Sequence, residues 1–234
     1  MPDINDFTLG LKAALKPEGT ITLEFPHLLQ LIKHTQFDTV YHEHFSYLSL
    51  YTVNRIFVAA GLRIWNVEQL TTHGGSLRVY GCHANALHKT QPAVSDILTA
   101  ESNQGLQGIE TFTNFQAKAD KVKNDLLFFL LEQKRLGKKI AAYGAAAKGN
   151  TILNYAGIKT DLIAFVCDAA IAKQYKFMPG SHIPILPPAA LRNFHLDCVV
   201  VLPWNIAQEI RTQNAELVER GIEFYIAVPE LTQV

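Results

Sequence analysis

Short apolar segments alternate with helical segments from residue 139 to the C-terminus, and this alternation constrains the fold of the chain most. Strands separated by a helix pair in parallel, because only a long crossover connection has room for a helix. The pattern therefore predicts a doubly wound α/β domain over residues 139–234. Its strands are predicted at 139–143, 162–167, 197–202 and 224–228, with helices from about residue 148 and up to residue 220.

The N-terminal part predicts a second arrangement of helix and strand. A helix is expected at 6–15, with Asp6 as its N-terminal cap, and a β-rich segment follows at 20–25. A helix, a turn and a strand in this order are typical of the later part of an α/β sheet. The next predicted elements are a helix at 52–60 and two strands at 62–70 and 76–82, joined by the loop 71–75.

Residues 85–138 are expected to connect these two parts. The stretch 85–108 is polar and mixed, and some helix is expected in it. From 113 to 136 apolar residues recur at helical spacing, which predicts one long helix. We therefore expect three parts: an α/β segment at 1–84, a helical connection at 85–138 and the doubly wound domain at 139–234.

The charge balance and the cysteines exclude several classes of protein. Lys plus Arg and Asp plus Glu both number 21, so no summed field attracts nucleic acid or an anionic membrane. The sequence holds no apolar run of about 18 residues, and its start lacks the features of a signal peptide. Cys82, Cys167 and Cys198 are widely spaced, which favours a reducing compartment. We expect a cytoplasmic protein without nucleic-acid or membrane partners.

The densest cluster of ionisable side chains is Tyr41, His42, Glu43 and His44. Imidazoles titrate near neutral pH and a neighbouring carboxylate orients or charges them, so the cluster predicts an acid/base site. No metal site is expected, because two histidines two residues apart need further ligands that the neighbouring sequence does not supply. The alternative is that these are polar residues at a helix start or at a seam between domains.

A stretch of glycine and alanine at 143–150 follows a predicted strand and opens a predicted helix. Small residues let the backbone approach a phosphate, and a helix N-terminus offers free N–H groups. Lys148 adds a positive charge to this stretch. Neither the dinucleotide-binding fingerprint nor the Walker motif is present. The alternative is that the alanines allow the helix to pack closely on the strand.

Two further features have both a functional and a structural interpretation. In 73–78, paired glycines expose backbone amides to a ligand and Arg78 can bind a phosphate or carboxylate, although a plain hairpin turn is the alternative. Asp168 follows the second predicted strand of the C-terminal domain, where an acid binds ribose in dinucleotide folds. A cap at the end of the strand is the alternative for Asp168.

Five motifs occur in one order along the chain: Tyr41–Leu48, His73–Arg78, Gly144–Thr151, Pro179–Ile185 and Leu202–Asn205. In this order they resemble the sugar C-methyltransferases of antibiotic deoxysugar pathways. Each motif alone is weakly specific, but five in register are hard to obtain by chance. The resemblance covers nearly the whole chain.

Members of that family have a cysteine-rich zinc-binding module, a central domain that binds S-adenosylmethionine and a doubly wound C-terminal domain. The resemblance implies that 1–84 is the last part of a Rossmann-like methyltransferase domain and that 139–234 is the Rossmann-like C-terminal domain. The cysteine cluster and the glycine-rich loop that holds the donor have no counterpart in this sequence. We therefore expect a fragment, a truncated gene product or one subunit of a split enzyme. Its expected partner is a complementary methyltransferase half or, through the edge of the strand at 20–25, a second copy.

The resemblance also implies the chemistry. The substrate is expected to be a 4-keto-6-deoxysugar linked to thymidine diphosphate (dTDP), and the methyl donor S-adenosylmethionine. A base removes a proton from the carbon next to the ketone, and that carbon accepts the methyl group. His44 is expected to be the base, with Glu43 orienting or charging it and Tyr41 bonding near the keto oxygen. By resemblance, His73 and Arg78 lie near the substrate, and Gly144, Lys148, Gly149 and Asn150 face the nucleotide or its pyrophosphate.

Two other functions remain open from the sequence. One is a non-catalytic module that binds a nucleotide sugar or a protein partner. The other is an NAD-type dehydrogenase domain, which the stretch 144–149 and Asp168 suggest and the absent fingerprint argues against.

Overall fold

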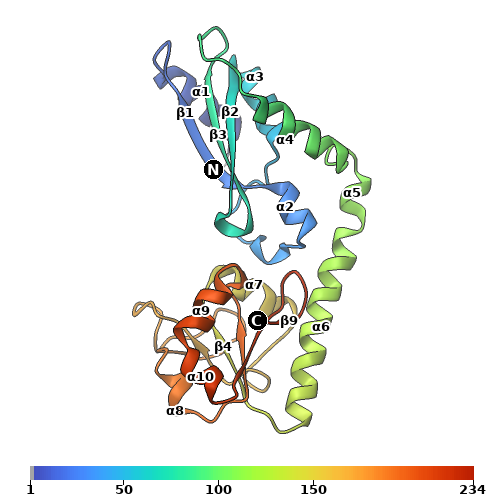
Figure 1. Ribbon diagram of the computed structural model, residues 1–234, viewed down its shortest axis with the longest axis vertical. Helices are drawn as coiled ribbons and strands as arrows, with labels where there is room; N and C mark the ends of the chain where they lie inside the picture. The colour runs from blue at the N-terminus through green and yellow to red at the C-terminus, as the bar shows by residue number, and fades with distance from the viewer. Residues whose placement is uncertain (1–2) are drawn as a thin grey trace. The chain divides into compact units, whose positions relative to one another are not determined.

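The computed structural model describes residues 3–234, which divide into two compact units (Figure 1). Unit 1 holds the residues up to His34 together with His42–Phe115. Unit 2 holds Thr35–Tyr41 together with Gln116–Val234. The short segment Thr35–Tyr41 thus belongs to the C-terminal unit, although the sequence on both sides of it belongs to the N-terminal unit.

The two units do not follow the boundaries that the sequence predicts after residues 84 and 138. Helix α4 (Pro92–Asn103) packs against strand β2 (Leu62–Leu70) and belongs to unit 1. The segment 35–41 packs against helix α7 (Ala147–Tyr155) of unit 2. Both contacts join parts of the chain that are distant in sequence, so a division by sequence position misses them.

Unit 1 is built on an antiparallel sheet with the strand order β1-β3-β2. β3 (Ser76–His83) lies in the middle and β1 (Ile21–Pro26) at one edge. Leu77 and Val79 of β3 are fully buried, as the alternation of side chains along a strand requires. The strands predicted at 20–25, 62–70 and 76–82 are confirmed to within one residue at each end.

Helix α3 (Leu50–Ala59) covers the apolar face of this sheet. Its Phe57 is almost fully buried and packs against β3 at Gly81. A Cβ atom at Gly81 would lie 2.2 Å from a ring carbon of Phe57, so only glycine permits this approach. The remaining helices of unit 1 are α1 (Ile4–Ala14), α2 (Leu28–Lys33), the 3₁₀ turn η2 (Thr72–Gly74) and α5 (Glu110–Thr113).

The start of α1 differs from the prediction. Asp3, and not Asp6, caps the helix, because its Oδ1 accepts hydrogen bonds from the backbone N–H groups of Asn5 and Asp6 at 2.9 and 3.0 Å. Asp6 instead lies in the first turn, where a negative charge interacts favourably with the helix dipole.

Unit 2 contains a six-stranded sheet that is parallel except for its last strand, which confirms an α/β fold. Buried side chains of β7, β8 and the flanking helices form its core. The two-residue strands β6 and β9 carry too few residues for a periodic signal and were not predicted. In sheet order, the strands are β6 (Ile185–Leu186), β5 (Val166–Cys167), β4 (Ile140–Tyr143), β7 (Cys198–Val201), β8 (Glu223–Ile226) and β9 (Thr232–Gln233).

Two predicted elements of unit 2 are shorter than expected. The strand expected at 162–167 retains only β5, although Ala164 and Phe165 still exchange hydrogen bonds with β4. The helix expected up to residue 220 is broken at Asn214, whose side chain donates to the carbonyl of Ile210. Besides α7, the helices are η1 (Phe37–Thr39), α6 (Phe115–Arg135), α8 (Ala190–Asn193), η3 (Trp204–Ile206), α9 (Ala207–Gln213) and α10 (Ala215–Glu219).

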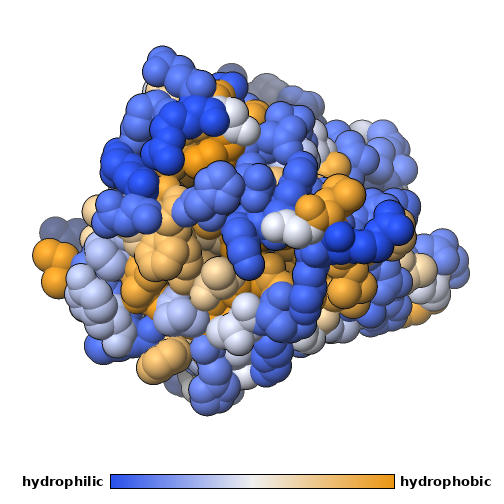
Figure 2. Space-filling model, turned by 90° about the horizontal axis from the view of Figure 1, so that it is seen from below, coloured by the Kyte–Doolittle hydropathy of each residue, from blue (hydrophilic) through white to orange (hydrophobic). Residues whose placement is uncertain are grey.

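The cysteines and the surface add two observations. Cys82, Cys167 and Cys198 are free and buried. Within the described residues, no helix combines the length and the apolar character that crossing a membrane requires. Figure 2 shows hydrophobic surface among hydrophilic side chains on one face, and exposed apolar side chains such as Phe128 and Phe194 are ordinary on globular domains.

Candidate functional site

The predicted acid/base residues His44 and Glu43 line a pocket of about 200 Å³ in unit 1. The segment that carries them, 42–47, forms neither helix nor strand and ends where Ser49 caps α3. The rings of His44 and Tyr47 lie edge to face, 6.1 Å apart between centroids. The remaining walls come from Ile4, Pro26, Phe45, Ser46 and Leu48.

A second pocket, of about 210 Å³, brings His44 and His73 together. It shares His44 and Pro26 with the first pocket. The sequence places these two histidines near the substrate by resemblance, and the structure shows that they line one space. The other residues around this second pocket are Glu24, Phe25, Pro26 and Ser76.

The loop that carries His73 has an unusual backbone. His73, Gly74 and Gly75 all have positive φ angles, of 55°, 85° and 119°. A non-glycine residue in this region is uncommon, and such strain often accompanies a functional constraint. A Cβ atom at Gly75 would lie 2.6 Å from Cγ of Gln30, so the second glycine is needed for packing. The segment is therefore both the predicted turn between β2 and β3 and one wall of the pocket.

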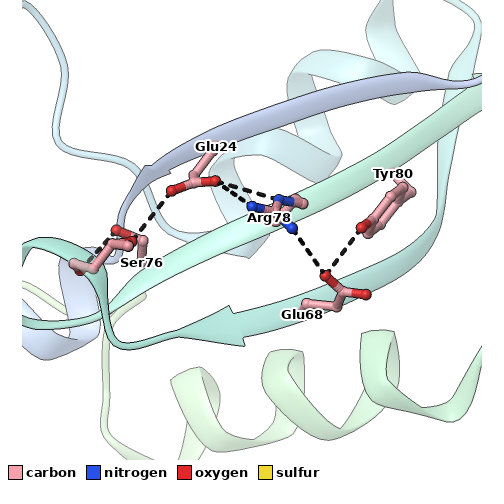
Figure 3. Close-up of polar contacts among 6 residues, drawn as sticks. Glu24, Glu68, Ser76, Arg78 and Tyr80 are labelled. Carbon is pink, nitrogen blue, oxygen red and sulfur yellow. Dashed lines mark hydrogen bonds and ion pairs between the residues drawn. The ribbon is translucent and has the colours of Figure 1, made fainter.

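Arg78 lies between two carboxylates on the polar face of the sheet (Figure 3). Glu24 of β1 and Glu68 of β2 stand directly opposite it on either side, and their carboxylate oxygens lie 2.9 and 3.6 Å from its guanidinium. The hydrogen bond between Glu24 and Arg78 lowers the pKa of the carboxyl and raises that of the guanidinium. An anionic ligand at Arg78 would compete with both acids, and its predicted contact with substrate stays a prediction.

A buried pair, His27 and Glu101, connects several chain segments of unit 1. Nε2 of His27 lies 2.7 Å from Oε1 of Glu101, and Glu101 is fully buried. Its two carboxylate oxygens also accept the backbone N–H groups of Leu50 and Tyr51, at 2.6 and 2.9 Å. The N–H of His27 donates to the carbonyl of Gly75. The pair thus connects α4, the start of α3 and the loop of His73.

In unit 2, Gly144 and Gly149 of the predicted phosphate loop are explained by packing. A Cβ atom at Gly144 would lie 2.4 Å from Pro203, and one at Gly149 would lie 2.8 Å from Leu202. Both contacts are with the segment after β7, so the motif Gly144–Thr151 packs against the motif Leu202–Asn205. Asn150 lies in the first turn of α7, and contact of this loop with a nucleotide stays a prediction.

Lys148 is held at the start of α7 by two neighbours. Its Nζ donates to Oδ1 of Asn205 at 2.7 Å and lies 4.5 Å from the centre of the Trp204 ring. Burial lowers the pKa of Lys148. The indole N–H of Trp204 in turn donates to the carboxylate of Asp38 at 2.8 Å, and burial raises the pKa of Asp38 to about 6.

Asp168 acts as the cap that the sequence offered as an alternative. Oδ2 accepts the N–H of Ala145 at 2.8 Å and lies 3.1 Å from Nζ of Lys173, and Oδ1 accepts the N–H of Ala170 at 2.8 Å. Both oxygens are thus engaged within the loops at this end of the sheet, which weakens the ribose-binding interpretation.

The two units divide the predicted site residues. His44, Glu43, His73 and Arg78 belong to unit 1, and the structure brings His44 together with both Glu43 and His73. Tyr41 and the loop residues Gly144, Lys148, Gly149 and Asn150 belong to unit 2. Across residues 3–234, no three His, Cys, Asp or Glu side chains gather in a way that could hold a metal ion.

Sequence reasoning did not single out Glu24, His27, Asp38 or Glu101. Glu24 and its partner Arg78 are 54 positions apart in the sequence, and His27 and Glu101 are 74 apart. Asp38 and Trp204 are 166 positions apart, so local spacing gives no signal for any of these pairs. Only the cross-strand pairing of β1 with β3 could have pointed to Glu24, and that pairing requires the register.

Comparison with known proteins places the chain in a family. Residues 71–229 match the model of a C-methyltransferase C-terminal domain. C-methyltransferase NovU of Streptomyces niveus is 36% identical over 230 residues, which are 98% of this chain and 55% of that protein. The chain therefore spans about half the length of this relative. It belongs to the sugar C-methyltransferase family that its motifs resemble, and it corresponds to the C-terminal portion of that family.

Proposed function

We propose that the chain is the substrate-binding and base-bearing part of a C-methyltransferase that acts on the carbon next to the ketone of a nucleotide-linked 4-keto-deoxysugar. The observation that carries this proposal is the pocket in which His44 and His73 meet, beside the pocket that Glu43 and His44 share. The family resemblance assigns the proton transfer to His44, assisted by Glu43, and places His73 near the substrate.

In this proposal, His44 takes the proton from the carbon next to the ketone. A histidine suits that role because its imidazole changes protonation near neutral pH. Glu43 orients or charges His44, and His73 lines the second pocket together with His44. The roles of Tyr41 and of the start of α7, both in unit 2, stay predictions from the resemblance.

The methyl donor of the family is S-adenosylmethionine, which supplies an electrophilic methyl group. The described residues of unit 1 do not fit this cofactor, because none of its three strands leads through a glycine-rich loop into a helix. We therefore assign no step of donor binding to unit 1, and propose that another part of a longer or complementary polypeptide holds the donor.

The edge of the sheet in unit 1 supports this arrangement. Among the described strands, β1 pairs with β3 alone, so its other edge has no strand partner. An unpaired edge offers a row of N–H and C=O groups to a further strand. We propose that the remaining strands of a methyltransferase sheet, or a second copy of the chain, pair there.

The test is a calorimetric titration of the chain with dTDP-glucose, with S-adenosylmethionine and with NAD. A ligand that binds the folded protein also raises its melting temperature, which gives an independent readout. We expect binding of dTDP-glucose and none of the other two ligands. Binding of S-adenosylmethionine would refute the assignment of the donor to another part, and binding of NAD alone would favour the dehydrogenase alternative.

A non-catalytic nucleotide-sugar-binding module is the second candidate. It is favoured by unit 1, in which none of the three described strands leads through a glycine-rich loop into a helix. This candidate predicts the same titration result but no proton removal from the sugar, so a measurement of proton exchange separates the two.

A further inference from the structure

The pocket of His44 and His73 contains an acid that the family resemblance does not assign. Glu24 of β1 lines this pocket together with both histidines and Ser76. Its side chain is 36% exposed, so its carboxylate is partly accessible to solvent.

The carboxylate of Glu24 is fixed from two sides (Figure 3). Oε2 accepts hydrogen bonds from Nη2 and Nε of Arg78 at 2.9 and 3.3 Å, while Oε1 accepts one from the hydroxyl of Thr72 at 3.2 Å. Thr72 belongs to the turn that carries His73. Glu24 thus ties the strand β1 to the turn of His73 across the pocket.

Glu24 retains capacity to accept a further hydrogen bond. A carboxylate oxygen has about two lone-pair sites, and Oε1 uses one of them for Thr72 among the contacts of the described residues. The hydrogen bond from Arg78 lowers the pKa of Glu24, so the group is ionised at neutral pH. An ionised, pre-positioned carboxylate is a strong acceptor for a hydroxyl group.

The charge of Glu24 also decides which part of a ligand this pocket accepts. A carboxylate repels phosphate oxygens, whereas it binds neutral hydroxyl groups. Phe25 and Pro26 give the pocket an apolar wall beside these polar groups. A sugar ring presents both hydroxyl groups and apolar C–H faces, and so matches such a space.

We propose that Glu24 is a substrate-binding residue that accepts a hydrogen bond from a hydroxyl group of the sugar and keeps the nucleotide phosphates away from His44 and His73. This inference rests on the proposed function, since it takes the ligand to be a nucleotide-linked sugar. It assigns to Glu24 the selection of the sugar, rather than the phosphates, as the part of the ligand that enters this pocket.

The test compares two glutamates that pair with the same arginine. Glu24→Gln removes the charge inside the pocket, and Glu68→Gln removes the charge on the other side of Arg78, where Glu68 does not line the pocket. Calorimetry measures the affinity of each variant for dTDP-glucose and for dTDP. We expect Glu24→Gln to bind dTDP-glucose roughly tenfold more weakly, as the loss of a charge-assisted hydrogen bond predicts, and dTDP within about twofold of wild type.

Other outcomes overturn the inference in distinguishable ways. An equal loss of dTDP-glucose affinity in Glu24→Gln and Glu68→Gln would show that Arg78, and not a sugar contact, is responsible. Unchanged affinity in Glu24→Gln, or an equal loss for dTDP and dTDP-glucose, would also contradict a sugar-binding role while leaving the proposed function intact. A wild-type chain that binds neither ligand would overturn the proposed function, and this inference with it.

Discussion

The indole N–H of Trp204 donates a hydrogen bond to the buried carboxylate of Asp38, 2.8 Å away. This contact connects the segment 35–41 with the turn after β7 inside unit 2. Trp204 also lies under the ammonium group of Lys148. The segment 35–41, which leads directly into the predicted acid/base residues His42–His44, is thus anchored in unit 2.

The burial of Asp38 gives unit 2 a pH-dependent stability. Burial raises the pKa of Asp38 from 3.8 to about 6, so the folded protein holds this proton more tightly than the unfolded chain does. The contribution of Asp38 is most favourable below pH 4 and is lost as the pH rises through about 6. An asparagine at this position does not ionise, so Asp38→Asn avoids this loss of stability. Its amide oxygen still accepts the hydrogen bond from the indole of Trp204. We expect the variant to be more stable than wild type at pH 7, by up to about 3 kcal/mol.

Chemical denaturation at several pH values measures this effect. The difference between Asp38→Asn and wild type should shrink between pH 7 and pH 4. Asp96→Asn, at an exposed position of α4, is the control and should change the free energy of unfolding by about 0.5 kcal/mol or less. A difference between Asp38→Asn and wild type that is constant over this range would mean that Asp38 does not titrate there.

We expect the stability of unit 1 to depend more on Glu101 than on any other of its acidic residues. Its buried carboxylate accepts hydrogen bonds from the N–H groups of Leu50 and Tyr51 and contacts His27, and its removal leaves these groups buried without a partner. We expect Glu101→Ala to lower the free energy of unfolding by about 3–5 kcal/mol. Glu101→Gln should cost less, because its amide oxygen replaces one acceptor.

Urea denaturation followed by circular dichroism tests this expectation. Glu110→Ala, in the short helix α5, is the control and should change stability by about 0.5 kcal/mol or less. If Glu101→Ala matched this control, the buried network would have no role in holding the start of α3.

Two glycines in unit 1 should respond to alanine in opposite directions. At Gly81 the new methyl group would meet the ring of Phe57 at 2.2 Å, and Phe57 is held in the core, so the substitution should cost about 1–3 kcal/mol. Gly10 lies inside α1 with nothing within 4 Å of its Cβ position, and alanine there should stabilise by about 0.5–1 kcal/mol. Thermal unfolding of both variants checks the sign, and a stabilised Gly81→Ala would contradict the packing of Phe57 on β3.

The sequence predicts those parts of the fold that depend on local periodicity. β2 is predicted with its observed bounds, because Gly61 ends the helix before it and the turn at 71–75 follows it, although its alternation is interrupted by a bulge between Ile64 and Asn66. β6 and β9 are missed because two residues carry no period. The break at Asn214 is missed because one polar residue does not interrupt the helical periodicity of the apolar residues around it. Its hydrogen bond to the carbonyl of Ile210 is visible only in the structure.

The candidate site is less predictable than the fold. Local motifs point to His44, Glu43 and His73, since their chemistry is visible in the residue types. Glu24 and Glu101 gain their roles only from partners in other elements, namely Arg78 across the sheet and His27 at the end of β1. From the sequence, Arg78 is a candidate for binding a phosphate or carboxylate, whereas the register of the sheet pairs it with Glu24 and Glu68.

Exchange of the proton next to the ketone tests the assignment of His44 as the base. If this chain carries the base, it should catalyse that exchange with solvent deuterium in dTDP-4-keto-6-deoxyglucose without S-adenosylmethionine, as followed by proton NMR in D₂O. We predict exchange well above the rate in buffer for the wild-type chain and for His195→Ala, an exposed histidine in unit 2. His44→Ala should reduce the rate at least about 100-fold toward that of buffer. Equal exchange by His44→Ala and wild type, or none above buffer by wild type, would contradict the claim that His44 is the base.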